Sequence, residues 1–287
     1  MTVSTAVALA LAFASTILIN LAYLREHDAA AKLPALSLRR PLHSAQVLLG
    51  DRSWLLGFAM ESVGFLLYVA ALALASLALV QSVAAGGIGV LAYVSARVVG
   101  RRLAAHERAG VLVSTLGLLV LAISLAGGSE EGGTGSTSLI VLWLALSAGA
   151  ALLVATVGRR MIGAAVADGI AGGLFFSLGD VSTKVTTQGG GRLVFVVPLI
   201  LGYSLGTWLL QLGYQRGGAL TVAGIATLLT NALPIAAGTV VLDEPVPSGA
   251  YGVLRVIAFV AVTIGAILLA RPGKSGMPEG VPAPAEA

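Results

Sequence analysis

The sequence predicts an all-helical membrane protein, a bundle of about nine transmembrane helices, and three observations support this. Hydrophobic residues make up 57% of the 287 residues and charged residues only 10%, whereas a soluble domain carries about 25% charged residues. The apolar residues gather in runs of about twenty, the length that an α-helix needs to cross a hydrocarbon core of roughly 30 Å. Most basic residues lie between these runs. We therefore expect a multi-pass membrane protein surrounded by the lipid bilayer.

Nine apolar runs are predicted to be helices joined by mostly short connections. The first run has no Lys or Arg ahead of it, so we interpret it as an uncleaved span, because a secretory signal begins with a cationic region. The basic connection at 25–53 contains an apolar section, expected to lie on the membrane surface as an amphipathic helix. The tail at 272–287 is rich in Pro and Gly and is expected to be disordered. The approximate limits of the nine helices are 3–24, 54–74, 76–96, 109–127, 138–157, 161–183, 193–214, 218–241 and 251–270.

The distribution of Lys and Arg predicts an amino terminus outside and a carboxyl terminus inside. In that orientation all but three of the 17 basic residues fall in inner segments, and cytoplasmic loops carry the excess of Lys and Arg in membrane proteins. The exceptions are Lys184 and Arg192 in an outer segment and Arg255 just within the last helix. The net charge of +4 therefore reports topology, and no nucleic-acid partner is expected.

The chain is predicted to contain an inverted repeat. A shift of 142 residues overlays parts of the sequence, so that Gly64 falls on Gly206. The second to fourth runs then correspond to the seventh to ninth, and the charge distribution gives the two sets opposite orientations. We expect a first repeat of four helices at 1–127 and a second of five at 128–271. Inverted repeats are recurrent in secondary transporters, with the substrate site near the midplane between the halves.

Two carboxylates within the apolar runs are the first candidates for a binding site. Glu61 lies about a third of the way into the second run, and Asp168 lies about as deep in the sixth. A charged residue at such depth costs roughly 2.5–3.5 kcal/mol on insertion scales, so it usually has a function. The two side chains can face each other across the halves and bind a coupling proton or a cation such as Mg²⁺, which prefers oxygen ligands. The alternative is a structural Glu, protonated or paired with a neighbour.

Three further residues are expected to shape the substrate site. Pro234 and Asn231 interrupt the eighth run, and Gln81 occupies the matching part of the third. Proline removes a backbone donor and frees a carbonyl of the preceding turn, and broken helices near the midplane point to transport sites. The alternative for Pro234 is a packing kink. Asp180 and Lys184 are four residues apart and are expected to form an ion pair at the outer end of their helix.

The second half resembles the drug/metabolite transporter superfamily, whose units are described as EamA-like. The similarity lies in an Ala-Leu helix start, a mid-helix Pro, an acidic residue followed by Pro, a Gly near the start of the last helix and a small-residue helix closing on Lys. These are Ala219-Leu220, Pro234, Glu244-Pro245, Gly252 and the segment GGLFFSLGDVSTK that ends at Lys184. Members commonly have ten helices in two halves of five, so nine spans fit if the first half lacks its opening helix.

Within this superfamily the layout resembles the NIPA-type magnesium transporters. A basic inner loop is followed by a helix that opens with Trp54 and Gly57 and continues to Gly64. The NIPA pattern places Glu directly after that later Gly, where this chain has Phe65. Its own Glu61 lies about one turn earlier, on roughly the same face, and the Asn that the pattern expects nearby is absent. The resemblance implies that Glu61 and Asp168 are the candidate ligands if the chain carries a metal cation.

The sequence predicts a secondary transporter of a small solute or metabolite that works by alternating access and is coupled to protons or a cation. The alternatives are a magnesium or divalent-cation transporter and, from another class, a non-transporting membrane scaffold with a packed bundle and a salt-bridged Glu61. No HExxH motif, nucleophile–His arrangement or nucleotide-binding loop is present, so we expect neither an enzyme nor a cofactor. The Ala-, Gly- and Arg-rich composition is typical of a GC-rich bacterial genome and favours a bacterial plasma membrane. Small residues permit a homodimer without requiring one.

Overall fold

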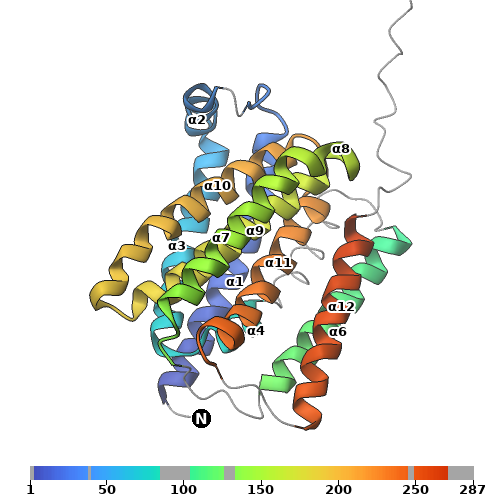
Figure 1. The fold of residues 1–287 in the computed structure, drawn as a ribbon. Helices are drawn as coiled ribbons and strands as arrows, with labels where there is room; N and C mark the ends of the chain where they lie inside the picture. The colour runs from blue at the N-terminus through green and yellow to red at the C-terminus, as the bar shows by residue number, and fades with distance from the viewer. Residues whose placement is uncertain (1–2, 38–39, 85–103, 126–132, 245–248, 271–287) are drawn as a thin grey trace, which may run out of the picture.

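The computed structural model describes residues 3–37, 40–84, 104–125, 133–244 and 249–270, and the regular structure in these ranges is entirely helical. Figure 1 shows the long helices side by side in one bundle, with the short α2 at one end. The helices are α1 (Val3–Ala30), α2 (Pro41–Leu49), α3 (Arg52–Leu74), α4 (Leu77–Ala84), α6 (Ala105–Leu125), α7 (Thr137–Leu153), α8 (Arg159–Met161), α9 (Ala164–Thr187), α10 (Val196–Tyr214), α11 (Ala219–Val241) and α12 (Ala250–Ala270). A π-helical turn at Val154–Gly158 joins α7 to α8, and a 3₁₀ turn at Gly190–Phe195 leads into α10.

The helices have the lengths and surfaces of membrane spans. Six of them, α1, α3, α7 with its continuation, α9, α10 with its leading turn and α11, are long and apolar enough to cross a bilayer. With 21 residues each, α6 and α12 are about 31 Å long at ~1.5 Å per residue. Large apolar side chains such as Leu66, Leu146 and Val197 point outward, as contact with lipid requires. The chain is a multi-pass membrane protein, which confirms the class predicted from composition.

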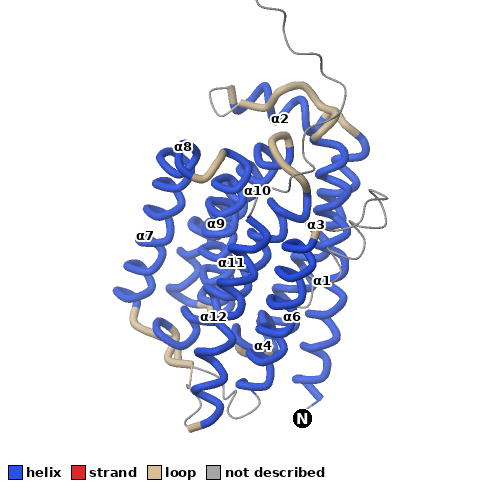
Figure 2. Tube along the Cα trace, turned by 90° about the vertical axis from the view of Figure 1, so that its right-hand side faces the viewer, coloured by secondary structure: helices blue, strands red, loops and turns tan. Residues whose placement is uncertain are grey.

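The positions of the predicted helices agree with the structure over most of the chain. Only Leu77–Ala84 of the third predicted span is described, as α4, so the count of nine spans stays a prediction. The expected surface segment contains α2, which lies where α1 ends and α3 begins (Figure 2). The expected disordered tail at 272–287 lies outside the described residues. The orientation relative to a membrane also stays a prediction.

The first helix is longer than predicted, and this changes which residues are inside. It continues six residues past the expected limit at Leu24 and ends at Ala30, because two strong helix formers, Ala29 and Ala30, follow the charged residues there. The extension carries Glu26 into the interior, where its side chain is fully buried. At the start of α3, the carboxylate of Asp51 accepts a hydrogen bond of 2.8 Å from the Trp54 N–H, a helix cap that fixes where the span begins.

The bundle is built from a few tightly packed helix pairs. The most extensive contacts join α1 to α3, α6 to α12, and α9 to both α10 and α11. In Figure 1, α1 and α9 run in opposite directions, as do α3 and α10 and also α6 and α12. The helix α7 packs on α9. Between the pairs, α11 contacts α4 as well as α12, so the interior is shared by helices from both ends of the sequence.

Glycine allows α9 and α10 to approach at backbone distance. A Cβ on Gly202 would lie 2.8 Å from the carbonyl oxygen of Phe175 and 2.9 Å from the backbone nitrogen of Gly179. Both neighbours are backbone atoms, so neither can move aside without shifting a helix. Close approach through small residues is the usual way in which membrane helices associate, since lipid provides no hydrophobic drive between them.

We expect Gly202→Ala to lower the free energy of unfolding by about 1–3 kcal/mol, the usual cost of overpacking a filled interface. Thermal unfolding of the detergent-purified protein measures the change. The matched control is Gly149→Ala on α7, where an added Cβ meets no atom within 4 Å. Equal unfolding temperatures for the two variants would contradict the close α9–α10 contact.

Candidate functional site

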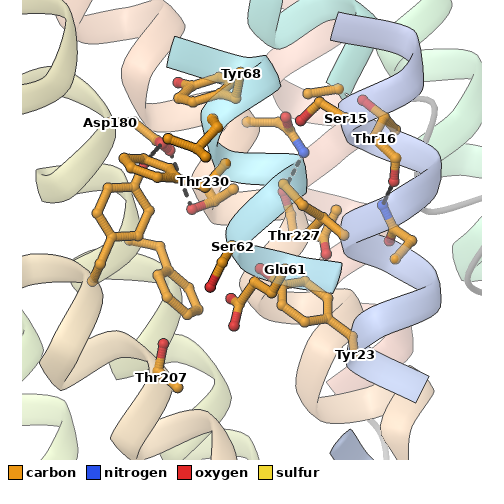
Figure 3. A pocket seen from close by; sticks show the side chains of 18 of the residues that line it. Ser15, Thr16, Tyr23, Glu61, Ser62, Tyr68, Asp180, Thr207, Thr227 and Thr230 are labelled. Carbon is orange, nitrogen blue, oxygen red and sulfur yellow. Dashed lines mark hydrogen bonds between the residues drawn. The ribbon is translucent and has the colours of Figure 1, made fainter. Parts of the chain in front are cut away.

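A cavity of about 420 Å³ lies between α1 and α3 on one side and α9, α10 and α11 on the other, with part of α4, and it opens at the surface of the bundle, where its lining includes the exposed Leu66 and Ile200. Figure 3 shows hydroxyl and carboxyl side chains from several of these helices pointing into it. Its acidic groups are Glu61 and Asp180, and the rest of its polar lining consists of Ser, Thr, Tyr, Asn and Gln. Among the residues that the structure describes, no Lys, Arg or His lines this cavity. Most of the lining surface is apolar, and its polar part consists mainly of oxygen-bearing groups with a negative formal charge.

Glu61 lies in the wall of the cavity, next to a second acid. Its side chain is in hydrogen-bonding contact with Glu26 of α1, and the amide nitrogen of Gln211 on α10 donates to Glu26 from the other side. Gly57 makes room for this arrangement, because a Cβ there would lie 2.7 Å from the Glu26 Cγ. A carboxylate can only accept hydrogen bonds, so the contact between the two acids requires a proton on one of them.

Sequence reasoning missed Glu26 because we assigned it to the basic connection after the first span. Four consecutive charged or titratable residues, Arg25 to Asp28, suggested a helix end. The signal that could have found it is spacing. Ala22, Glu26 and Ala30 recur every four residues, so they lie on one helix face, and all three are buried.

Asp180 belongs to the same cavity, rather than to the ion pair with Lys184 that its spacing suggested. Its carboxylate accepts a hydrogen bond of 2.5 Å from the Tyr203 hydroxyl and a longer one of 3.4 Å from the Thr230 hydroxyl. Close by, the amide nitrogen of Gln81 donates to the Tyr68 hydroxyl at 2.6 Å. Asp180 is thus surrounded by neutral hydroxyl and amide groups from α3, α4, α10 and α11.

The Lys184 ammonium group instead reaches across to the first half of the chain. It donates to the carbonyl oxygens of Leu72 at 3.1 Å and Ala75 at 2.9 Å, where the last carbonyls of α3 lack helical partners. Beside it, the carboxylate of Glu244 accepts a hydrogen bond of 3.0 Å from the backbone N–H of Leu77, at the start of α4. The corner between α3 and α4 is therefore held by two side chains from the second half.

Asp168 lies elsewhere, and the expected encounter with Glu61 is not found. It is the fifth residue of α9, so it sits near the end of the helix, and it is not among the residues that line the cavity. Its buried carboxylate is held by Arg159 at 2.5 Å and by Arg216 at 2.5 Å. These two arginines follow α7 and α10, so the cluster ties three helix ends together.

The other predicted site residues divide between the cavity and its support. Asn231 and Gln81 line the cavity, as proposed from the sequence, whereas Pro234 is buried in α11 and is not part of the lining. The helix α11 continues through Pro234 to Val241. Proline lacks the N–H that would otherwise bond to the carbonyl of Thr230, four residues earlier. Thr230 lines the cavity, so the missing helical hydrogen bond lies next to the cavity wall, although Pro234 itself is not part of the lining.

The comparisons with known proteins add one relative. The chain is similar to a protein of Arabidopsis thaliana described as "Probable magnesium transporter NIPA9", with 25% identity over 260 residues, which cover 83% of this chain and 74% of the plant protein. No protein-family model and no solved structure matches the sequence. The likeness supports a relationship to NIPA-type transporters, in line with the arrangement around Trp54, Gly57 and Gly64.

We expect Asp168→Asn to lower the stability of the protein without affecting the cavity. Removing one partner of a buried ion pair costs ~3–5 kcal/mol, and the 37% exposure of the Arg216 side chain favours the low end of that range. Thermal unfolding in detergent measures the loss. The control is Asp28→Asn, because the Asp28 side chain is 47% exposed and ion pairs open to solvent contribute little. A variant as stable as the wild type would contradict a structural role for Asp168.

Proposed function

We propose that this chain is a secondary transporter that carries a divalent cation, Mg²⁺ in the first place, across a membrane by alternating access. The observation that carries the proposal is the cavity between membrane-spanning helices. Its lining holds Glu61 and Asp180 and, within the described residues, no basic side chain. The printed description of the plant relative as a magnesium transporter supports the same substrate. The composition of the sequence supports a bacterial plasma membrane as its location.

The cavity suits a hydrated divalent cation in both size and chemistry. Mg²⁺ is reluctant to lose its waters and is usually bound by one or two carboxylates with several waters retained. Six waters at about 30 Å³ each occupy roughly 180 Å³, which fits within the 420 Å³ of the cavity. The hydroxyl and amide groups of the lining can bind those waters, and the two acids can balance the charge.

The packing of the helices supports alternating access between two inverted halves, at 1–127 and 128–271. The pair α1–α3 of the first half has its counterpart in the pair α9–α10 of the second, and members of corresponding pairs run in opposite directions (Figure 1). In this scheme α7 is the additional helix of the second half. The cavity lies between the two pairs, where a tilt of one half against the other would change the side from which it opens.

The contact between Glu26 and Glu61 supports exchange of the cation against protons. Two carboxyl groups in contact can share a proton, and Glu26 and Glu61 are in such contact. A cation that binds to Glu61 competes for the same oxygen atoms, so cation entry favours release of the proton. Transport of a cation in one direction is then coupled to movement of a proton in the other.

A second candidate is an organic cation, which agrees with the small-solute transporter expected from the sequence. Aromatic rings from α3, α9 and α10 line the cavity beside the acids, and the rings of Phe65 and Tyr203 meet edge to face with their centroids 4.7 Å apart. Aromatic faces attract organic ammonium groups. The scaffold alternative expected a packed bundle with a salt-bridged Glu61, and the cavity and the neighbouring Glu26 speak against it.

The decisive experiment measures Mg²⁺ entry into proteoliposomes that contain a Mg²⁺-sensitive dye. We expect Glu61→Gln to reduce the initial rate at least about tenfold, the equivalent of ~1.4 kcal/mol, because the amide keeps the shape but loses the charge that attracts the cation. Asp28→Asn removes an acid outside the cavity and should transport normally. Wild-type vesicles no faster than empty liposomes would refute the proposal. Entry of a labelled tetraalkylammonium ion instead of Mg²⁺ would assign the cavity to organic cations.

We also expect an imposed Mg²⁺ gradient to move protons in the opposite direction. A pH-sensitive dye inside the same vesicles detects this movement, with an ionophore present to prevent a membrane potential from driving it. The proton signal should disappear in Glu61→Gln together with Mg²⁺ entry. Mg²⁺ entry with no accompanying proton movement would contradict the exchange and leave transport of the cation standing.

A further inference from the structure

The chain contains two asparagines, Asn20 and Asn231, and both line the cavity although they are far apart in the sequence. Each stands in the same short pattern, Thr-x-x-x-Asn, formed by Thr16 and Asn20 on α1 and by Thr227 and Asn231 on α11. All four residues are in the wall of the cavity. A residue type used only twice, in one pattern and in one cavity, indicates a role for its particular chemistry.

The two asparagines are held in the same way. In each, the amide nitrogen donates to the backbone carbonyl of the threonine four residues earlier, at 2.8 Å for Asn20 and 2.6 Å for Asn231. Because a carbonyl can only accept, it is the NH₂ end of each amide that is fixed to the helix. The amide oxygen Oδ1 is then left over, and in both residues it is buried without a partner in the protein.

Two further oxygens of the lining are in the same condition. The hydroxyl oxygen of Thr227 and the carboxyl oxygen Oε2 of Glu61 are buried and unpartnered among the described residues. An unmet polar group inside a protein costs about 1–3 kcal/mol, and Asn20, Thr227 and Asn231 are only 3%, 4% and 1% exposed. Asp180 differs, because hydroxyl groups of its neighbours already donate to its oxygens. Among the described residues, these four oxygens are therefore the buried unpartnered polar atoms of the residues that line the cavity.

We infer that Asn20 Oδ1, Asn231 Oδ1, Thr227 Oγ1 and Glu61 Oε2 bind a divalent cation together. This inference rests on the proposed function and identifies the ligands. Three neutral oxygens and one carboxylate oxygen match the preference of Mg²⁺ for oxygen ligands, and water molecules complete its six-fold coordination.

The arrangement draws its ligands from both halves of the chain. Asn20 and Glu61 come from α1 and α3, whereas Thr227 and Asn231 come from α11, which contacts α1. A cation held by all four oxygens bridges the two halves. The affinity for the cation then depends on how the two halves are placed relative to each other. A ligand can favour one conformation only if it binds that conformation more tightly than the other, and this arrangement provides such a difference.

The test measures binding of MgCl₂ to the detergent-purified full chain by isothermal titration calorimetry. We expect Asn20→Leu and Asn231→Leu to weaken binding at least about tenfold each, since loss even of groups that only orient ligands costs 10–100-fold. Asn20→Asp and Asn231→Asp keep an oxygen at the site and should bind at least as tightly as the wild type. The control is Ser182→Ala, which should leave the affinity unchanged. Ser182 lies on α9 outside the cavity, and its buried hydroxyl donates to the carbonyl four residues earlier.

The outcomes separate this site from the function. Leu variants that bind Mg²⁺ as tightly as the wild type would overturn the site, and so would Asp variants that bind no better than the Leu variants. The Asp variants decide the matter if the Leu variants fail to fold. If the Leu variants bind Mg²⁺ as tightly as the wild type and still transport it into proteoliposomes, the transport proposal stands but this site does not. If the wild type binds Mg²⁺, the Leu substitutions abolish this binding, and no Mg²⁺ flux is detected in proteoliposomes, the site stands and transport is refuted.

Discussion

Holding the carboxyl group of Glu61 inside a lipid-embedded bundle is the constraint on which the rest of the structure depends. Hydrocarbon offers nothing to solvate an acid, so the protein must supply the partners. It does so without a cationic neighbour among the described residues. Gly57 lets α1 approach α3 closely enough for Glu26 to meet Glu61, and Gln211 supports Glu26 from α10. The remaining oxygen of Glu61 is buried at a cavity whose lining also contains hydroxyl and amide groups among mostly apolar surface.

The basic residues near the helix ends have structural partners of their own. Arg159 and Arg216 neutralise Asp168 at one end of α9, and Lys184 near the other end binds backbone carbonyls. These basic groups lie near the two ends of α9, away from the cavity, which lies between them along the helix. This separation gives the cavity its negative character, since a single Lys or Arg in its wall would cancel much of the attraction for a cation.

Much of the fold and part of the site could be predicted from the sequence, and the failures have physical causes. Apolar runs of membrane-spanning length indicated the helices, and the depth of Glu61 in its run made it a candidate site residue, which the structure places in the lining of the cavity. We expected Asp168 rather than Asp180 near Glu61, and the structure reverses this, because α9 is buried on most of its surface and its hydrophobic pattern does not reveal which face meets the cavity. Asn20 was overlooked because a neutral amide costs less in a membrane helix than a charge, so it does not stand out as Glu61 does.

The two side chains that hold the α3–α4 corner have a consequence for how the protein divides into moving parts. Lys184 and Glu244 belong to the second half of the sequence, yet they bind the backbone of Leu72, Ala75 and Leu77. This corner is fastened to the opposite half at that end of the bundle. In the proposed alternating access, a movement that opens the cavity at this end must break these three hydrogen bonds or carry the corner along, so the moving part would not coincide with the proposed first repeat. In that scheme the end of α3 would act as a latch against opening on that side.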